Sequence, residues 1–310
     1  MTPSAMADRE GLIWFDGEMV DWREAKTHVL THTLHYGVGV FEGVRAYQGD
    51  RGTCIFRLED HTNRLFQSAH ILGMDMPFDK ATLNQAQLDV VRQNNLESAY
   101  LRPLCFLGSE GMGLRADQLR THVMIAAWEW PSYVSPELQE QGMKVRTSSF
   151  TRHHVNVTMC KAKAVGNYTN SILALREAME SNAQEALLLD PEGYVAEGTG
   201  ENFFMVRKGV VHTPELTSCL DGITRDTIIK LIDDLGLKLV ERRITRDEVY
   251  IADEAFFTGT AAEVLPIQSL DNRVIGGGKR GPITEKLQSI YFDLVRGRRA
   301  EYPEWLSPVV

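Results

Sequence analysis

The sequence lacks the features that mark several classes of protein. Its four cysteines are widely spaced and none belongs to a CxxC pair, so neither a zinc site nor a redox site of that kind is expected. No uninterrupted apolar stretch reaches the roughly 18 residues that a membrane-spanning helix needs, and the start, MTPSAMADREG, has no apolar signal core. We therefore expect a protein of the cytoplasm that does not bind a membrane.

Basic residues are also too scattered to form a large positive surface. The 33 lysines and arginines are outnumbered by 42 aspartates and glutamates, which gives a net charge of -9, and no long basic run occurs. Because nucleic acids and anionic membranes are bound by clustered positive charge, neither is expected as the main partner. Small molecules are expected instead.

The chain is long enough for two packed domains, with 310 residues of which 43% are hydrophobic. Residues 131–142, PSYVSPELQEQG, have two prolines among polar residues and no hydrophobic periodicity, which is typical of a linker. We therefore expect a smaller N-terminal α/β domain over residues 1–130 and a larger C-terminal domain over residues 143–310. Strand and helix signals alternate without a strict βαβ rhythm, which predicts an α+β fold class.

Local signals predict the elements of both halves. Asp16-Gly17 between apolar residues predicts a β-hairpin. Thr224 is expected to cap a helix that ends at Gly236, and Pro282 to lie in the first turn of the last helix. The other expected elements are strands over 53–58, 98–108, 121–130 and 143–150, helices over 59–73 and 170–181, and a meander of short strands over 185–214.

Three segments resemble known motifs without meeting their requirements. GGGKRGPIT has Arg273 where a phosphate loop needs its first glycine, so a surface turn is expected. His28, His32 and His35 have helical spacing but no acidic residue between them, so ordinary contacts are favoured over a metal site. GSEGMGLR lacks the GxGxxG register of a dinucleotide site and is expected to be a glycine-hinged loop.

Two lysines separated by a single residue occur in TMCKAKAVGNYTNS, Thr158 to Ser171. A lysine becomes a nucleophile toward carbonyls when burial or a neighbouring cation disfavours its ammonium form. In a strand, Lys161 and Lys163 would point the same way, so each could favour the free amine of the other. A solvated pair at a strand edge is the alternative, and the segment alone does not decide between them.

A nucleophilic lysine needs a carbonyl partner, of which pyridoxal phosphate is the most versatile. That cofactor needs an acid at its pyridine nitrogen, and Glu197 in the glycine turn AEGTGEN is a candidate. It also needs a phosphate site, for which LDGITR, FTGTAAE and Arg57 offer backbone amides, hydroxyls and a guanidinium. Each of these also has an ordinary structural explanation as a turn carboxylate, a helix cap or a surface charge.

Taken in order, the segments resemble the branched-chain amino acid aminotransferases of class IV, the fold type IV pyridoxal-phosphate enzymes. The resemblance implies two α+β domains with the active site at the domain interface, and pyridoxal 5'-phosphate as cofactor with no metal. It runs along nearly the whole chain, through IWFDGEMVDW, HYGVGVFEGVRAY, FRLEDHTNRL, SAYLRPL, GMG, KAVGNY, AEGTGEN, LDGITRDTIIKL, ADEAFFTGTAAEV and GPIT.

The resemblance also implies roles for individual residues. Lys163 would be the catalytic lysine that bonds the cofactor, Tyr168 would contact its phenolic oxygen and Glu197 its pyridine nitrogen. The phosphate site would consist of Arg57, Ile223, Thr224 and Thr260, with Leu220 packed on the ring. The implied substrate pocket is lined by Phe41, Gly43, Tyr100, Trp130, Thr260 and Ala261, with Arg102 and Tyr133 at its rim and with Tyr36 and Leu114 entering from a neighbouring subunit.

The implied activity is transamination of leucine, isoleucine and valine with 2-oxoglutarate by a ping-pong mechanism, in a homodimer at least, with a hexamer as a further option. Arg102 would bind the distal carboxylate of glutamate, unless it is a structural charge on its strand. D-amino acid transaminases, R-selective amine transaminases and aminodeoxychorismate lyases share the fold and remain alternatives, as does a non-catalytic binder of the cofactor. Val165 and Val38-Gly39 depart from the family pattern and leave the substrate range open, and Lys161 has no assigned role.

Overall fold

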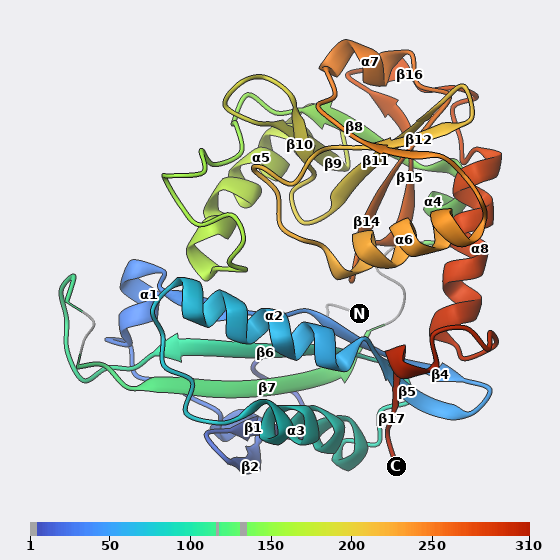
Figure 1. Ribbon diagram of the computed structural model, residues 1–310. Coiled ribbons are helices and arrows are strands. Elements are labelled where there is room, and N and C mark those ends of the chain that lie inside the picture. The colour runs from blue at the N-terminus through green and yellow to red at the C-terminus, as the bar shows by residue number, and fades with distance from the viewer. Residues whose placement is uncertain (1–4, 116–117, 131–134) are drawn as a thin grey trace. The chain divides into compact units, whose positions relative to one another are not determined.

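The computed structural model describes residues 5–115, 118–130 and 135–310. The chain forms two compact units (Figure 1). The first unit comprises Met1–Pro131, Ala162–Gly166 and Val295–Val310, and the second comprises Ser132–Lys161 and Asn167–Leu294. Among the described residues, no helix has the length and apolar character needed to cross a membrane.

Within its described residues, the first unit is built on an eight-stranded antiparallel sheet in the order β17-β5-β4-β6-β7-β1-β2, with β3 paired to β6. Its strands are β1 (Leu12–Phe15), β2 (Glu18–Asp21), β3 (Gly39–Phe41), β4 (Val44–Gly49), β5 (Gly52–Phe56), β6 (Ala99–Leu107), β7 (Thr121–Glu129) and β17 (Leu306–Pro308). Its helices are η1 (Trp22–Glu24), α1 (His32–Tyr36), α2 (Leu58–Ile71), α3 (Lys80–Gln93) and η3 (Pro303–Trp305).

Because side chains alternate along the strands, the two faces of this sheet carry different residues. Along β6 and β7, Leu101, Val123 and Ile125 belong to the core that α2 and α3 cover. The intervening side chains, Tyr100 and Arg102 among them, point to the other face. The strands therefore present part of the candidate site on the face away from the two helices.

Most of the elements expected in this half are confirmed. Asp16 and Gly17 both have positive φ, 48° and 104°, as the hairpin turn between β1 and β2 requires. The helix expected over 59–73 is α2, which ends before Gly73 in the left-handed region. No helix was expected over Lys80–Gln93, because its polar residues obscure a buried stripe formed by Leu83, Ala86 and Val90.

The described part of the second unit is built on a nine-stranded sheet in the order β10-β9-β8-β15-β14-β11-β12-β13, with β16 paired to β15. Its strands are β8 (Met143–Thr147), β9 (Glu185–Leu189), β10 (Val195–Glu197), β11 (Asn202–Arg207), β12 (Val210–Thr213), β13 (Leu239–Glu241), β14 (Glu254–Gly259), β15 (Glu263–Leu270) and β16 (Arg273–Val274). The helices are η2 (Val165–Asn167), where the chain passes between the units, and α4 (Pro136–Gln141), α5 (Tyr168–Glu180), α6 (Ile223–Asp234), α7 (Arg246–Tyr250) and α8 (Pro282–Val295).

An additional pairing between β10 and β11 closes part of this sheet into a ring, in the order β10-β9-β8-β15-β14-β11. The interior of the ring is filled by a hydrophobic core to which every strand of the ring contributes. One core residue from each strand is Val145, Leu187, Val195, Phe203, Phe257 and Leu265. The expected meander is confirmed, because β9, β10, β11 and β12 pair in sequence as antiparallel neighbours.

In this half one short helix was not predicted, and one predicted helix cap needs correction. Residues Pro136–Gln141 form the short helix α4, whose cap Ser135 accepts a hydrogen bond from the Leu138 amide at 3.3 Å. Gly222, not Thr224, caps α6, so that Thr224 lies in the first turn. A Cβ at Gly222 would lie 1.9 Å from the side-chain oxygen of Asn202, so the close approach of these two segments requires glycine there.

The expected division into residues 1–130 and 143–310 around a linker stays a prediction. Packing groups two later segments with the first unit. Ala164 forms a bridge with Val40, and β17 pairs with β5, so the segment containing Lys163 and the C-terminal residues lie on the first unit.

Candidate active site

Lys163 is held in the first unit by both of its backbone polar groups. Its carbonyl accepts a hydrogen bond from the Phe41 amide at 3.1 Å, and its own amide donates to the hydroxyl of Ser68 on α2 at 3.0 Å. Its Nζ lies 5.2 Å from the centre of the Phe41 ring. The amine is therefore presented at a fixed place on the aromatic side of this unit.

The segment around the two lysines is not a strand, so the condition under which each would favour the free amine of the other is not met. Lys161 instead contacts oxygens of the second unit. Its Nζ donates to the carbonyls of Leu216 and Cys219, the latter at 3.0 Å, and to the Asp221 carboxylate at 2.7 Å.

A buried charged cluster lies next to the Lys163 backbone contact. Glu42 is fully buried and accepts hydrogen bonds from Arg64 at 2.7 and 2.8 Å and from His61 Nδ1 at 2.7 Å. His61 and Arg64 are three residues apart and therefore lie on one face of α2. Their contacts fix the chain between Phe41 and Gly43, which the sequence reasoning did not foresee.

The charges in this cluster have opposite effects on its two titratable groups. Burial raises the pKa of Glu42, but the Arg64 guanidinium and the hydrogen bond from His61 outweigh it and hold that pKa well below its usual range. Burial lowers the pKa of His61, and the charges of Arg64 and Lys163 lower it further although Glu42 opposes them. The cluster thus consists of an ion pair between Glu42 and Arg64 beside a neutral histidine.

An aromatic wall formed by Phe41, Tyr100, Trp128 and Trp130 lies on the open face of the first sheet. Tyr100 is packed against Trp128 and Trp130, with ring centres 5.2 and 4.9 Å apart. Trp128 was not expected at the site, although it lies directly opposite Tyr100 in the β6–β7 register. The wall is an apolar surface suited to a hydrophobic side chain.

Arg102 places a positive charge on this wall. Its guanidinium lies 4.6 Å from the centre of the Phe41 ring, and its Nη2 donates to the Tyr100 hydroxyl at 3.0 Å. Its Nε is buried and has no hydrogen-bond partner among the described residues. At Gly43, an added Cβ would lie 2.1 Å from the Tyr100 hydroxyl, so only glycine allows this tyrosine its position.

Arg57 lies between β5 and α2 rather than at the end of the strand. It is the N-cap of α2 in the left-handed conformation, with φ of 55°. Its guanidinium is buried, pairs with Asp60 and lies 4.5 Å from the centre of the Trp305 ring. These contacts hold a cation at the N-terminus of α2, where backbone amides also favour an anion.

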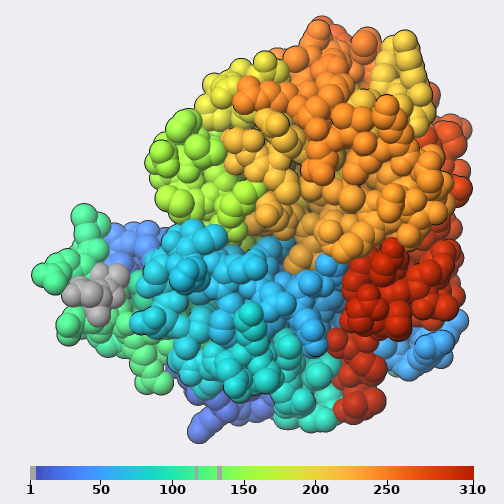
Figure 2. All heavy atoms as spheres, viewed as in Figure 1, coloured from blue at the N-terminus to red at the C-terminus, as the bar shows by residue number. Residues whose placement is uncertain are grey.

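Tyr36 is the last residue of α1, and Leu114 lies in the loop from Gly108. Figure 2 shows the α1 segment and this loop next to each other on the surface. His32 joins the two segments, since its Nε2 lies 2.7 Å from the Gly113 carbonyl oxygen. Leu114 is 89% exposed and Tyr36 is 41% exposed. Tyr133 lies outside the described residues.

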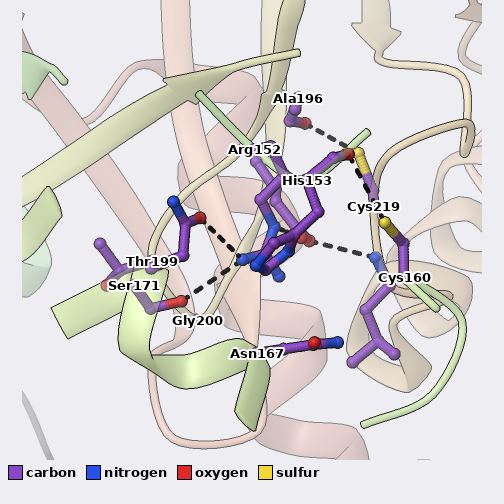
Figure 3. Close-up of polar contacts among 12 residues, drawn as sticks. Arg152, His153, Cys160, Asn167, Ser171, Ala196, Thr199, Gly200 and Cys219 are labelled. Atoms are coloured by element: carbon purple, nitrogen blue, oxygen red, sulfur yellow. Dashed lines mark hydrogen bonds and ion pairs between the residues drawn. The ribbon is translucent and has the colours of Figure 1, made fainter. Parts of the chain in front are cut away.

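In the second unit, Glu197 is paired with Arg152, a residue that no sequence signal marked. Arg152 Nε donates to Glu197 at 2.6 Å, and both side chains are buried. Burial lowers the pKa of Arg152, but Glu197 and the Tyr168 phenol raise it above the usual value. Arg152 also approaches Ser171 on α5 at 3.5 Å, as Figure 3 shows. The other Glu197 oxygen accepts from Asn202 and from the Leu220 amide, both at 3.3 Å.

The residues expected to hold a phosphate lie at two turns of the second unit. Ile223 and Thr224 are buried in the first turn of α6, which begins without a capping side chain. Thr260 and Ala261 form the half-buried turn between β14 and β15. Nearby on β14, the buried hydroxyl of Thr258 has no hydrogen-bond partner among the described residues.

These groups fit pyridoxal phosphate. The first turn of α6, which begins without a capping side chain, presents backbone amides and the Thr224 hydroxyl, groups suited to a phosphate dianion. Glu197 keeps an acceptor site open, because its two contacts at 3.3 Å are long for hydrogen bonds. Lys163 supplies an amine, and Arg57 a cation, from the first unit.

A family model for class IV amino-transferases matches residues 39–270. The chain belongs to the class IV aminotransferase family. A branched-chain-amino-acid aminotransferase of Pseudomonas aeruginosa is 64% identical over 305 residues, which cover 98% of this chain and 99% of that protein. Among solved structures, a T.th. branched-chain amino acid aminotransferase with pyridoxamine 5'-phosphate has a TM-score of 0.95 and 48% identity, and the match covers 97% of this chain and 99% of that one. The same enzyme complexed with N-(5'-phosphopyridoxyl)-L-glutamate has a TM-score of 0.94.

The comparisons confirm the expected fold class of this class IV aminotransferase, two α+β units of the fold that its solved relatives share. Of the residues that the family resemblance assigns to the site, Lys163, Arg57 and Arg102 belong to the first unit, and Glu197, Thr224 and the 260–261 turn belong to the second.

Replacing His61 with glutamine is expected to flatten the pH dependence of stability. As pH falls below the ordinary histidine pKa of about 6.5, the unfolded chain binds a proton that folded His61, with its lowered pKa, does not. The stability that this histidine contributes is therefore complete above that pH and is lost below it. Between about pH 7.5 and about pH 5.5, the wild type should lose more stability than His61→Gln in urea unfolding, by at most about 1.4 kcal/mol, the limit for one proton over this window.

The control is His70→Gln, which replaces an exposed histidine of the same helix and should keep the wild-type slope. A His61→Gln variant with the same slope as the wild type would show that His61 titrates normally when folded.

Proposed function

We propose that this chain catalyses transamination of leucine, isoleucine and valine with 2-oxoglutarate, with pyridoxal 5'-phosphate as cofactor. The observation that carries the proposal is Arg102 on the aromatic wall. One surface offers packing for a branched apolar side chain together with a buried guanidinium Nε that has no described partner. Such a wall can accept leucine and also the carboxylate of glutamate, the two kinds of side chain that this exchange requires.

The residues that the family resemblance assigns to the cofactor would hold it. Arg57, Thr224, Thr260 and the Ile223 amide would bind its phosphate, and Leu220 would pack against its ring. When bound, pyridoxal phosphate supplies a conjugated ring that takes up the electron pair left when a proton leaves the substrate Cα.

The protein groups around the ring would control protons. Glu197 would hold a proton at the pyridine nitrogen, aided by the Arg152 pair that fixes its orientation. Tyr168 would donate to the phenolic oxygen. Lys163 would bond the cofactor between turnovers and, once displaced by the amino acid, move the Cα proton with its Nζ.

The substrate would lie against Phe41, Gly43, Tyr100 and Trp130, with Thr260 and Ala261 contributed by the second unit and Tyr133 at the rim. A branched side chain gains by burial against the aromatic wall, by about 0.8 kcal/mol per methylene group. Arg102 can turn its guanidinium toward a carboxylate when glutamate binds. We place the enzyme in the cytoplasm.

We also propose that the active form is at least a homodimer, in which Tyr36 and Leu114 complete the pocket of the neighbouring subunit. The region around α1 and the loop from Gly108 exposes many apolar side chains, as protein interfaces do. They are Val29, Leu30, Leu34, Tyr36, Met112 and Leu114. Sedimentation equilibrium should give a dimer or a multiple of it, such as a hexamer, and a monomer at micromolar concentration would contradict this.

An absorbance spectrum tests the proposed activity. With excess cofactor, wild type and Lys161→Ala should show the band of lysine-bound pyridoxal phosphate and lose it to the pyridoxamine form when L-leucine is added. Lys163→Ala should do neither, because it has no amine to bond the cofactor. Absence of the band from every variant would contradict the family's chemistry in this chain.

The same spectrum separates the alternatives. Conversion by D-alanine or an (R)-amine but not by L-leucine would indicate another transaminase of the fold. A band that no amino donor changes would indicate a binding protein. Loss of the band in Lys161→Ala alone would show that the site is assigned to the wrong lysine.

Replacing Arg102 with methionine is expected to separate the two substrates. Loss of a charge-assisted contact worth about 1.5–3 kcal/mol should lower kcat/KM for L-glutamate about 10- to 100-fold and leave that for L-leucine within about threefold. Arg102→Lys keeps the charge but not the planar fork, so its kcat/KM for L-glutamate should lie between those of wild type and Arg102→Met. Equal losses for both substrates would mean that Arg102 only supports the strand.

A further inference from the structure

Lys161 has no place in the proposed chemistry, yet its side chain makes an unusually complete set of contacts. An ammonium group has three N–H donors, and Lys161 directs them at the carbonyls of Leu216 and Cys219 and at the Asp221 carboxylate. All three acceptors belong to one segment, 216–221, which joins β12 to α6. The lysine therefore spans the segment from one end to the other.

Segment 216–221 has no regular secondary structure, so it depends on such contacts for its shape. Its inner side is tied to the Glu197 region. The Leu220 amide donates to Glu197 at 3.3 Å, the Leu220 carbonyl accepts from Asn202 at 3.0 Å, and Cys219 Sγ lies 3.2 Å from the Ala196 carbonyl oxygen. Lys161 supplies the contacts on the outer side.

The shape of segment 216–221 determines where the start of α6 lies. Gly222 caps α6, and the first turn of α6 carries Ile223 and Thr224. Leu220 is the residue assigned to the ring, and the first turn of α6 is the one assigned to the phosphate. A shift of segment 216–221 would therefore move two of the surfaces that the cofactor needs.

The two kinds of contact that Lys161 makes are not of equal weight. Its pair with Asp221 is exposed, with 41% of the lysine and 62% of the aspartate side chain accessible, and such pairs contribute little. The carbonyl contacts differ, because they satisfy backbone acceptors in a segment without a ladder and Cys219 is buried. We therefore expect the contacts of Lys161 with the two carbonyls, rather than its pair with Asp221, to stabilise segment 216–221.

We propose that Lys161 is a positioning residue that orders segment 216–221 and so sets the affinity of the apoenzyme for pyridoxal phosphate. The inference rests on the proposed function, since it takes the cofactor from there. Lys161 takes part in no chemical step. The two lysines thus have separate tasks: Lys163 reacts, and Lys161 shapes the cofactor surface of the second unit.

The test compares Lys161→Met, Asp221→Asn and the control Lys144→Met, which removes an exposed lysine from the same unit. Equilibrium dialysis of the apoproteins measures the Kd for pyridoxal phosphate, and hydrogen exchange measures opening of segment 216–221 without cofactor. Lys161→Met should raise the Kd at least about tenfold and speed exchange in that segment, because two charge-assisted contacts are lost. Asp221→Asn should change the Kd less than about threefold, and the control not at all.

At saturating cofactor, kcat of Lys161→Met should stay within about threefold of wild type, because no step uses the side chain. General destabilisation would instead speed exchange throughout the unit, and that result would overturn the proposal. Lys161→Gln, which keeps amide donors on a shorter stem, should give an intermediate Kd and replaces the methionine variant if that one does not fold.

A wild-type Kd in both Lys161 variants, with binding intact in the wild type, would overturn the inference and leave the proposed function standing. Failure of the wild type to bind the cofactor would overturn both.

Discussion

A carboxylate removed from water must be paired, and this constraint shapes both halves of the site. Glu197 is buried at the end of β10, where desolvation would be costly for an unpartnered charge. Arg152 pairs with it and also approaches the start of α5. The pair thus joins three segments that are distant in sequence, and the turn, the helix and the irregular chain around residue 152 are fixed together.

The first unit applies the same constraint to Glu42, whose carboxylate accepts three short hydrogen bonds. Arg64 and His61 occupy both oxygens at 2.7 to 2.8 Å. Glu197 has one short contact and two long ones, so it can accept another donor. The two carboxylates accept the same number of hydrogen bonds and differ in length, since every contact of Glu42 is short and two of the three contacts of Glu197 are long.

Backbone contacts then transmit the rigidity of these pairs to the reactive group. Glu42 fixes the neighbouring Phe41, whose amide binds the Lys163 carbonyl. On the other unit, Glu197 receives the Leu220 amide, and Lys161 holds the outer side of the same segment. Charged side chains in both units therefore bind backbone groups, and these contacts position the Lys163 segment and segment 216–221.

Local patterns in the sequence determined the elements of the fold and the residue types of the site. The Asp16-Gly17 turn, the alternation along β6 and β7 and the glycine after α2 each rest on neighbours in the chain, so sequence predicts them. It failed for α3, whose stripe of three apolar residues is buried only because a sheet covers it. It also failed for Thr224, because α6 is capped by Gly222, where Asn202 leaves no room for a Cβ. The motifs around Lys163 and Glu197 can likewise be recognised from the sequence alone.

Only tertiary structure decided which groups surround them. Arg152 lies in an irregular segment with no periodicity to mark it, and its meeting with Glu197 is a contact over 45 positions. Trp128 reaches the aromatic wall through strand register, and Lys161 is distinguished from Lys163 by carbonyls more than fifty residues further along the chain. The sequence by itself determined the local elements and the residue types that the site needs. The pairing of buried charges and the hydrogen bonding of distant backbone groups were decided only by the tertiary structure, because both depend on partners that the local sequence does not specify.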